Sequence, residues 1–235
     1  MLSEFKEGKI LLIDKPLDWT SFDIVNKLKF TLKRSLPKLK IGHAGTLDPR
    51  ATGLLIICTG KLTKTINSIQ EQFKVYSGTF FLGATTESYD TEKPVNQTFD
   101  ISHITEEAIY QTVEQFKGVL TQTPPAHSAV KVKGRKAYDW AREGEVVKLR
   151  SREVTIYEFD ITKIDMPHIH FRIKCSKGTY IRSIANDFGI ALNNGAYLTS
   201  LRRENIGDFS VEDAWDIDEL ILDIRSKIDQ QHEGI

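Results

Sequence analysis

The stretch KIGHAGTLDPRATGLLIICTG, residues 40–60, decides how this chain is organised. A short segment leads into a loop rich in Gly, Thr, Asp and Pro, and an apolar run typical of a buried strand follows. Gly42, Gly45 and Gly53 permit backbone angles that other residues resist, and Pro49 biases Asp48 toward an extended conformation. A carboxylate held on such a loop suits a nucleophile or a general base, although an Asp-Pro pair also commonly does no more than cap a turn.

Length and composition are those of an ordinary globular protein. The 235 residues are 40% hydrophobic and 27% charged, and 32 basic residues balance 32 acidic ones. A zero net charge neither indicates nor excludes RNA binding; an RNA-binding protein of this composition needs its cations gathered on one face. Basic residues crowd positions 131–152, whereas the C-terminal tail is acid-rich. No apolar run is long enough to span a bilayer and no signal peptide is recognisable, so the expected location is cytoplasmic.

Cysteine and histidine spacing does not predict a metal site. Cys58 and Cys175 lie in separate predicted strands without a CxxC spacing, so we expect two reduced core residues. His168 and His170 lie two residues apart on one strand face, and further ligands at suitable spacing are missing from the sequence.

Periodicity and capping residues predict the main helices. Thr20 with Asp23 resembles a capping box, and Phe22, Val25, Leu28 and Leu32 then recur on one helical face. Thr105 is the expected cap of a second helix at 105–117, which turns Ile109, Val113 and Phe116 to the core. A third helix is expected to start with Thr179 as its cap and to end at Gly189.

Runs of apolar and β-branched residues predict the strands. They cover residues 9–14, the apolar part of the opening stretch, residues 74–83, and a strand pair at 153–164 and 168–178 joined around Asp165-Met166-Pro167.

The segment 121–152 interleaves cations with aromatic rings. Lys131, Lys133, Arg135, Lys136 and Arg142 alternate with Tyr138 and Trp140. Such a mixture suits a looped RNA, because cations bind phosphates and ring faces stack on bases. A solvated helix whose aromatic residues pack inward explains the same pattern, and periodicity alone does not separate the two.

Four motifs occur in the order of one known family. GHAGTLDP, the K-x-Y of Lys74 to Tyr76, PPAHSAVK with its G-x-x-x-Y-x-x-A-R continuation, and KGTYIR at 177–182 resemble the bacterial tRNA pseudouridine synthases of the TruB type, which isomerise uridine-55 in the T-loop of tRNA. The resemblance runs from Lys9 to about Ala214. Departures include Asp18 where most members have Gly, Ile56 where Pro is usual, and His127 where an aromatic residue is usual.

The resemblance implies a set of site residues. Asp48 is the implied catalytic carboxylate, and Arg182 is its implied ion-pair partner. Tyr76 is implied to pack against the target base, and we also expect it to help remove the C5 proton. The remaining implied RNA contacts are His43, which fills the space left by the flipped base, the pocket residues Tyr180 and Leu201, and Lys133 and Arg135 of the insertion. The polar loop ATTESYDTE, residues 84–92, receives no catalytic role.

The resemblance also implies the fold and the partners. We expect an α+β pseudouridine-synthase fold with a mixed, mostly antiparallel sheet, as a single catalytic domain over residues 1–235 with the RNA-gripping insertion at about 121–152. Longer family members append an RNA-binding PUA domain, which the sequence does not accommodate, so an isolated T-arm hairpin is expected to serve nearly as well as full tRNA. A monomer acting on tRNA is expected, with no membrane, protein partner, metal or other cofactor.

Two other functions remain open from the sequence. A non-catalytic tRNA-binding or folding module would keep the pocket without turnover, although it would not need an ion pair there. A carboxylate hydrolase acting on a small nucleoside would release free uracil, and the basic, aromatic insertion disfavours it. The atom that Asp48 attacks is also open: it could attack C1′, add to the base, or remove a ribose proton.

Overall fold

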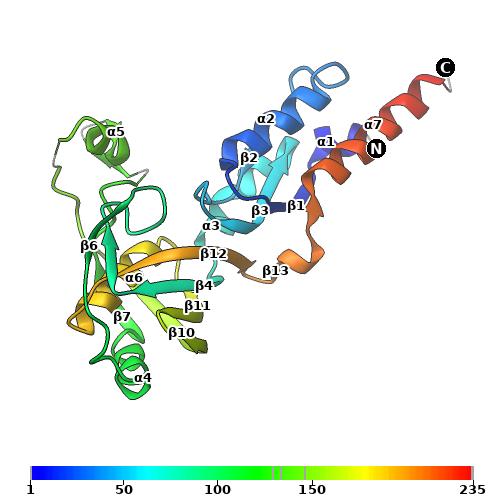
Figure 1. Ribbon diagram of the computed structural model, residues 1–235. Coiled ribbons are helices and arrows are strands. Elements are labelled where there is room, and N and C mark those ends of the chain that lie inside the picture. Colours follow the sequence, from blue (N-terminus) through cyan, green and yellow to red (C-terminus); the bar gives the residue numbers. More distant parts are fainter. Residues whose placement is uncertain (1, 129, 133, 146, 234–235) are drawn as a thin grey trace. The chain divides into compact units, whose positions relative to one another are not determined.

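The computed structural model describes residues 2–128, 130–132, 134–145 and 147–233. The chain divides into two compact units (Figure 1). The terminal unit comprises Met1–Val75 with Arg202–Ile235, and the central unit comprises Tyr76–Leu201. The chain passes from one unit to the other within two strands, β4 (Lys74–Leu82) and β12 (Ala196–Ile206). The expectation of a single catalytic domain stays a prediction.

The terminal unit is built on a mixed sheet in the order β14-β1-β3-β12. β1 runs antiparallel to β3 and parallel to β14, while β12 runs parallel to β3. β2 pairs antiparallel with the end of β3, and β13 pairs antiparallel with the end of β12. The elements of this unit are α1 (Leu2–Glu7), β1 (Ile10–Lys15), α2 (Ser21–Leu32), β2 (Ile41–His43), β3 (Thr52–Thr59), η1 (Gly60–Thr65), α3 (Ile66–Glu71), β13 (Phe209–Ser210), η2 (Val211–Asp213), β14 (Trp215–Asp216) and α7 (Ile217–Glu233).

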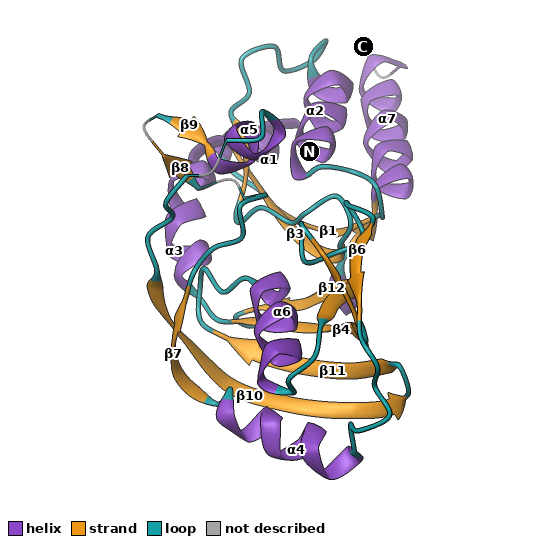
Figure 2. Ribbon diagram, turned by 60° about the vertical axis from the view of Figure 1, so that its left-hand side comes forward, coloured by secondary structure: helices purple, strands orange, loops and turns teal. Residues whose placement is uncertain are grey.

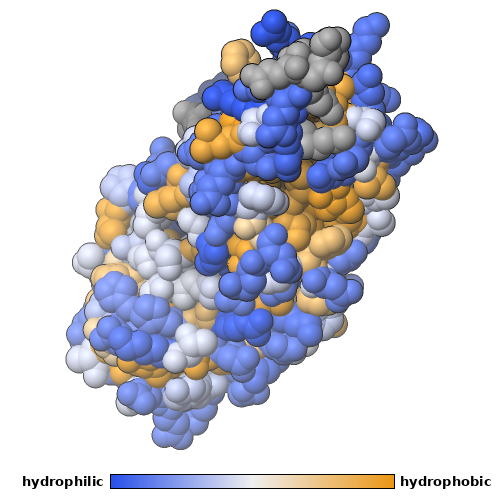
Figure 3. Space-filling model, turned by 90° about the vertical axis from the view of Figure 1, so that its right-hand side faces the viewer, coloured by the Kyte–Doolittle hydropathy of each residue, from blue (hydrophilic) through white to orange (hydrophobic). Residues whose placement is uncertain are grey.

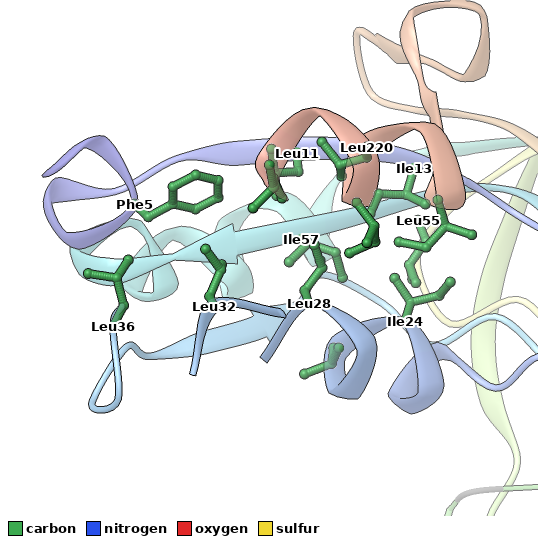
Figure 4. Packing of buried hydrophobic residues seen from close by; sticks show 14 residues of the cluster. Phe5, Leu11, Ile13, Ile24, Leu28, Leu32, Leu36, Leu55, Ile57 and Leu220 are labelled. Atoms are coloured by element: carbon green, nitrogen blue, oxygen red, sulfur yellow. The ribbon is translucent and has the colours of Figure 1, made fainter. Parts of the chain in front are cut away.

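The core of the terminal unit lies where α2 and α7 pack on the sheet. Figure 4 shows Ile24, Leu28 and Leu32 of α2 beside side chains of β1, β3 and α7. The predicted capping box is confirmed, because Thr20 accepts from the backbone of Asp23 and the Asp23 carboxylate accepts from the backbone of Thr20. One prediction for this helix is wrong: Phe22 is 58% exposed, and Ile24 occupies the core face in its place.

The central unit is built on strands in the order β12-β4-β11-β10-β7. β10 pairs antiparallel with β11, which confirms the strand pair predicted around Asp165-Met166-Pro167. On its other side β10 runs antiparallel to β7, a pairing that was not predicted. The elements of this unit, besides most of β4 and β12, are β5 (Ala84–Thr86), β6 (Val95–Thr98), α4 (Glu106–Gln115), β7 (Gly118–Gln122), β8 (Lys131–Val132), β9 (Arg135–Lys136), α5 (Ala137–Arg142), β10 (Arg152–Asp165), β11 (His168–Cys175) and α6 (Ile181–Ala191).

Aromatic side chains make the core of the central unit. Phe80 stacks on Phe171 at 4.2 Å between ring centroids, and Phe188 of α6 lies 5.5 Å from Phe80. Phe116, at the end of α4, lies 6.0 Å from Phe188, so α4 and α6 cover the same face of the sheet (Figure 2). Aromatic pairs in stacked and tilted arrangements stabilise the fold by more than the burial of their apolar area alone.

Two predicted boundaries of α6 are wrong. Tyr180, not Thr179, occupies the N-cap position, and the Thr179 hydroxyl donates instead to the carbonyl of Ser176. Gly189 lies inside the helix, where an added Cβ would meet the backbone of Ala196 at 2.3 Å. The glycine is therefore needed for the close approach of β12 rather than to end the helix.

The distribution of polar and apolar residues is that of an ordinary globular protein, as the composition predicts. Hydrophilic side chains predominate on the face in Figure 3, with hydrophobic patches between them. Cys58 and Cys175 are both buried and reduced, as predicted. Within the described ranges, no helix is long and apolar enough to cross a membrane. The helices and the mixed, mostly antiparallel strands confirm the α+β class.

Candidate active site

The loop that carries Asp48 is anchored on both sides of this residue. The Ser21 hydroxyl, at the first position of α2, donates to the Leu47 carbonyl at 3.0 Å and accepts from the Leu47 amide at 2.8 Å. The Asp18 amide donates to the Pro49 carbonyl at 2.8 Å. Asp18 itself has a φ of 63°, a left-handed angle that Asp tolerates better than most residues. The substitution for the family's usual glycine therefore keeps the turn that holds the loop.

Arg203 fixes the other end of this loop from inside the protein. Its side chain is 1% exposed and donates to the carbonyls of Gly45, Thr46 and Leu54 at 3.1, 3.2 and 2.8 Å. The close approach needs glycine at position 53, which has a φ of 103° and where an added Cβ would lie 2.4 Å from the Arg203 carbonyl oxygen. A guanidinium that satisfies three carbonyls makes the loop rigid, which a positioned carboxylate requires.

Lys15 is a buried cation close to the loop. It is fully buried, and its Nζ donates to the carbonyls of Pro16 and Trp19, both at 2.7 Å. Burial lowers the pKa of Lys15 to about 8, while the charge of Asp48 opposes the decrease and that of Arg203 adds to it. Lys15 is therefore a structural support whose charge acts on Asp48.

The titration of Lys15 gives a prediction for stability. We expect the free energy of unfolding of the wild type, relative to Lys15→Met, to rise between pH 8 and pH 10.5, by up to about 3 kcal/mol. In this window the unfolded lysine keeps its proton and the folded one loses it, so the unfolded state binds more protons and stability increases with pH. Urea unfolding of both proteins at about pH 7.5, 9 and 10.5 measures the difference. A difference that stays constant across these pH values contradicts the buried titration.

His43 ends β2 immediately before the loop that carries Asp48. Burial lowers the pKa of His43, and the nearby charge of Arg203 lowers it further, against a hydrogen bond with the Gly45 backbone. The imidazole is therefore neutral at pH 7 and can occupy space near apolar groups without the cost of burying a charge.

Arg182, in the central unit, is a buried member of a polar cluster. Its side chain is 5% exposed and lies 3.5 Å from the carboxylate of Asp90, whose side chain is 7% exposed. Arg182 Nη1 also donates to the carbonyls of His127 and Ser88, at 3.0 and 3.4 Å. Arg182 is thus buried, and its guanidinium is held in place from several sides.

The start of α6 is tied to the end of β7. The Gln122 side chain accepts from the Tyr180 amide at 2.7 Å and donates to the Tyr180 carbonyl at 3.0 Å. The Tyr180 ring packs against the guanidinium of Arg152 at 4.9 Å. The other expected pocket residues of the central unit, Tyr76 of β4 and Leu201 of β12, lie on neighbouring strands, and Tyr76 is 9% exposed.

The basic insertion uses one of its cations internally. Arg135 makes two bonds to the Glu143 carboxylate, at 2.6 and 3.2 Å, and its guanidinium lies 4.4 Å from the Trp140 ring. The Trp140 ring thus contacts a cation of the insertion itself, and this contact does not decide between the two interpretations of the segment. Lys133, the other expected contact, lies outside the described residues.

Sequence reasoning missed one charged residue in each unit and one cavity. Asp90 lies in the loop that received no role, and Arg203 received none either; both are charged residues buried against partners distant in sequence. The terminal unit also has a cavity of about 550 Å³ rich in lysine. Its cationic lining residues are Lys6, Lys38, Lys40, Lys61 and Lys64.

Asp48 belongs to the terminal unit and Arg182 to the central unit, so the surroundings of each residue are described within its own unit. The terminal unit brings Asp48 together with Lys15 and His43 with Arg203, while the central unit brings Arg182 together with Asp90. Among the described residues, no group of three or more His, Cys, Asp or Glu side chains could hold a metal ion.

Comparison with known proteins identifies the family. Residues 33–181 match the TruB family pseudouridylate synthase (N terminal domain). The chain is 58% identical over 217 residues to tRNA pseudouridine synthase B of Flavobacterium johnsoniae, covering 91% of this chain and 95% of that protein. It is 49% identical over 216 residues to tRNA pseudouridine synthase B of Phocaeicola vulgatus, covering 91% and 92%.

A solved structure shares the fold. The chain resembles one chain of the "Crystal Structure of a Cbf5-Nop10-Gar1 Complex" with a TM-score of 0.71 and 27% identity, over 93% of this chain and 55% of that longer one. The pseudouridine-synthase fold expected from the motifs is thus confirmed. Since the family match spans more than half of the sequence and the relatives align over nine tenths of it, the chain belongs to the TruB family of pseudouridylate synthases.

Proposed function

We propose that this protein isomerises uridine-55 in the T-loop of tRNA to pseudouridine, with Asp48 as the catalytic carboxylate. The observation that carries the proposal is the anchored Asp48 loop, fixed by Ser21, Asp18 and Arg203, in a chain of the TruB family. A carboxylate on a rigid loop keeps its geometry through a reaction, whereas a turn cap needs no such network.

The reaction needs few chemical groups. The bond between uracil N1 and ribose C1′ breaks, the detached base turns, and C5 bonds to C1′ while its proton leaves and N1 gains one. Atoms and electrons balance within the substrate. Attack at C1′, addition to the base and removal of a ribose proton all require Asp48 to be ionised.

Arg182 is the proposed partner that keeps Asp48 ionised. A guanidinium within reach of a carboxylate favours its charged form and offsets the cost of removing it from water. Support comes from the burial of Arg182 and from the bonds that hold its guanidinium in place. A solvated arginine would not be held in a fixed position for pairing with a carboxylate.

The target uridine has to leave the folded T-loop, at a cost of a few kcal/mol. In the proposal, His43 fills the space that the base leaves, and Tyr76 and Leu201 hold the extruded ring with Tyr180 beside it. Burial, which lowers the pKa of His43, supports this role, because an uncharged ring can enter a base stack without the cost of desolvating a charge. Tyr76 is also the proposed aid in removing the C5 proton.

Cations on both units support RNA binding. The insertion, through Lys133 and Arg135, is proposed to contact phosphates, and the lysine-lined cavity of the terminal unit supplies further positive charge. Arg135 would exchange its bond to Glu143 for a phosphate oxygen, a change that costs little for an exposed pair. A monomeric state and a cytoplasmic location complete the proposal.

Replacing Lys133 and Arg135 together by Gln is expected to weaken tRNA binding and to flatten its salt dependence, by about 0.7–0.9 in the log-log slope for each phosphate that the variant no longer neutralises. Measuring tRNA affinity between about 50 and 200 mM salt tests this expectation. Lys163→Gln, at a lysine on β10 that is 64% exposed, serves as the control. An unchanged slope in the double variant would mean that these residues do not bind phosphate.

Release of tritium from tRNA carrying C5-labelled uridine tests the proposed function. We expect release from a transcript with uridine at position 55 and none from the same transcript with cytidine there. Tight binding without release would identify a binding or folding module, and free uracil in solution would identify a hydrolase. Either result would overturn the proposal.

A further inference from the structure

Positive charge is concentrated in one part of a chain whose overall charge is zero. Residues 24–70 contain nine Lys and Arg residues and one acidic residue, Asp48. All of them belong to the terminal unit. A neutral protein that binds a polyanion needs its cations separated from its acids in this way. The stretch is therefore a candidate nucleic-acid surface that is independent of the insertion.

Helix α2 presents part of this charge on one face. Asn26, Lys29, Phe30 and Lys33 follow the spacing i, i+3, i+4 and i+7, so they lie on one stripe of the helix. The opposite side packs into the core through Ile24, Leu28 and Leu32. The outer stripe, which we call the α2 stripe, therefore faces away from the core.

The α2 stripe forms one wall of a groove of about 600 Å³. The segment between α2 and β2 forms the other wall, through Leu36, Pro37, Lys38 and Leu39. Phe30 is 77% exposed, which is unusual for a ring of this size. Within the described residues, Lys29, Lys33 and Lys38 have no ion-pair partner, whereas the neighbouring Lys27 pairs with Asp218. The groove thus combines three available cations with an open ring face.

We infer that this groove binds the RNA substrate outside the target loop, with Lys29, Lys33 and Lys38 on phosphates and Phe30 stacked on a base. This inference rests on the proposed function for the identity of the RNA. Cations serve any phosphate backbone, and a ring face stacks on any base, so the interaction does not depend on sequence. A protein partner would need acidic residues to match the lysines. The RNA substrate of the proposed function already carries the negative charge that these lysines require.

The position of the groove relative to the catalytic loop supports this inference. Both lie in the terminal unit, and only Lys40 and the three-residue strand β2 separate Leu39 from the loop after His43. A strand of that length spans about 10 Å. One nucleotide of a stacked strand advances about 3.4 Å, so RNA at the start of the Asp48 loop can reach the groove a few nucleotides away.

Two variants with matched controls test the inference by measuring tRNA affinity and its salt dependence. Lys29→Gln with Lys33→Gln is expected to lower affinity roughly tenfold at 0.1 M salt and to flatten the salt slope. The control, Lys117→Gln with Lys163→Gln, removes the same charge from exposed lysines of the central unit and should change affinity less than about twofold. Phe30→Ala should lower affinity about tenfold without changing the salt slope, because stacking releases few counterions. Tyr110→Ala, at an aromatic residue of α4 that is 50% exposed, is its control.

The outcomes separate this inference from the proposed function. Turnover at saturating tRNA should stay at the wild-type level in both variants, because neither touches the Asp48 loop; a wild type without turnover would instead overturn the proposed function. Weaker binding of both full tRNA and a T-arm hairpin would mean that the groove contacts that arm. Weaker binding of full tRNA alone would mean that the groove contacts the rest of the tRNA. Both results support the inference. Affinity and salt slope equal to those of the controls would overturn it.

Discussion

Replacing Asp48 by Asn is expected to lower turnover at saturating tRNA by at least about 1,000-fold, because the amide cannot serve as a nucleophile or a base. The change removes one charge and alters no volume, and the loop keeps its bonds to Ser21, Asp18 and Arg203. Binding should therefore stay within about twofold of the wild type. Tritium release from C5-labelled tRNA and equilibrium binding measure the two quantities separately.

Asp18→Asn is the matched control for this experiment. Asp18 lies on the neighbouring turn, pairs with Arg50 at 2.7 Å, and has the left-handed backbone angle that Asn also accepts. The same chemical change there removes an exposed ion pair, which costs little, and should leave turnover near the wild-type level. Wild-type turnover in Asp48→Asn would end the proposal of a catalytic carboxylate at this position.

Local signals predict helices and strands in both units. The capping box at Thr20, the helix capped by Thr105 and the strand pair around Pro167 each depend on residues a few positions apart, and each is confirmed. The failures are also local. Phe22 fits a helical period but lies outside the core, because the core face of α2 is set by β1, β3 and α7 rather than by the helix itself. The α+β fold is expected mainly from the family motifs.

The contacts of Arg203 and Arg182 could not be predicted, because their partners are distant in sequence. Arg203 binds carbonyls about 150 residues away, and Arg182 binds Asp90 across about 90 residues. The periodicity of apolar residues along the sequence does not indicate such interactions. The surface around α2 does leave a local signal, because residues 24–70 lack any acid besides Asp48. Basic and acidic residues are separated more completely here than in the basic segment at 131–152. Counting charged residues in successive windows of the sequence reveals this separation.

Replacing Arg182 by Ala is expected to reduce turnover strongly while tRNA binding changes much less. In the proposal, Arg182 keeps Asp48 ionised at the moment of reaction, and this task does not contribute to holding the RNA. The variant also leaves Asp90 buried without its cation, which costs about 3–5 kcal/mol of stability. Lost activity could then come from unfolding alone, so the single variant needs a second one beside it.

A double variant separates catalysis from stability. Arg182→Met with Asp90→Asn removes both charges of the buried pair while keeping apolar and amide volume, so much of the stability lost in Arg182→Ala should return. Turnover should not return, because the carboxylate of Asp48 still lacks its cation. Urea unfolding measures the first effect and tritium release the second. A double variant that regains both would show that Arg182 acts only on the fold, and equal losses of binding and turnover in Arg182→Ala would exclude its pairing with Asp48 in catalysis.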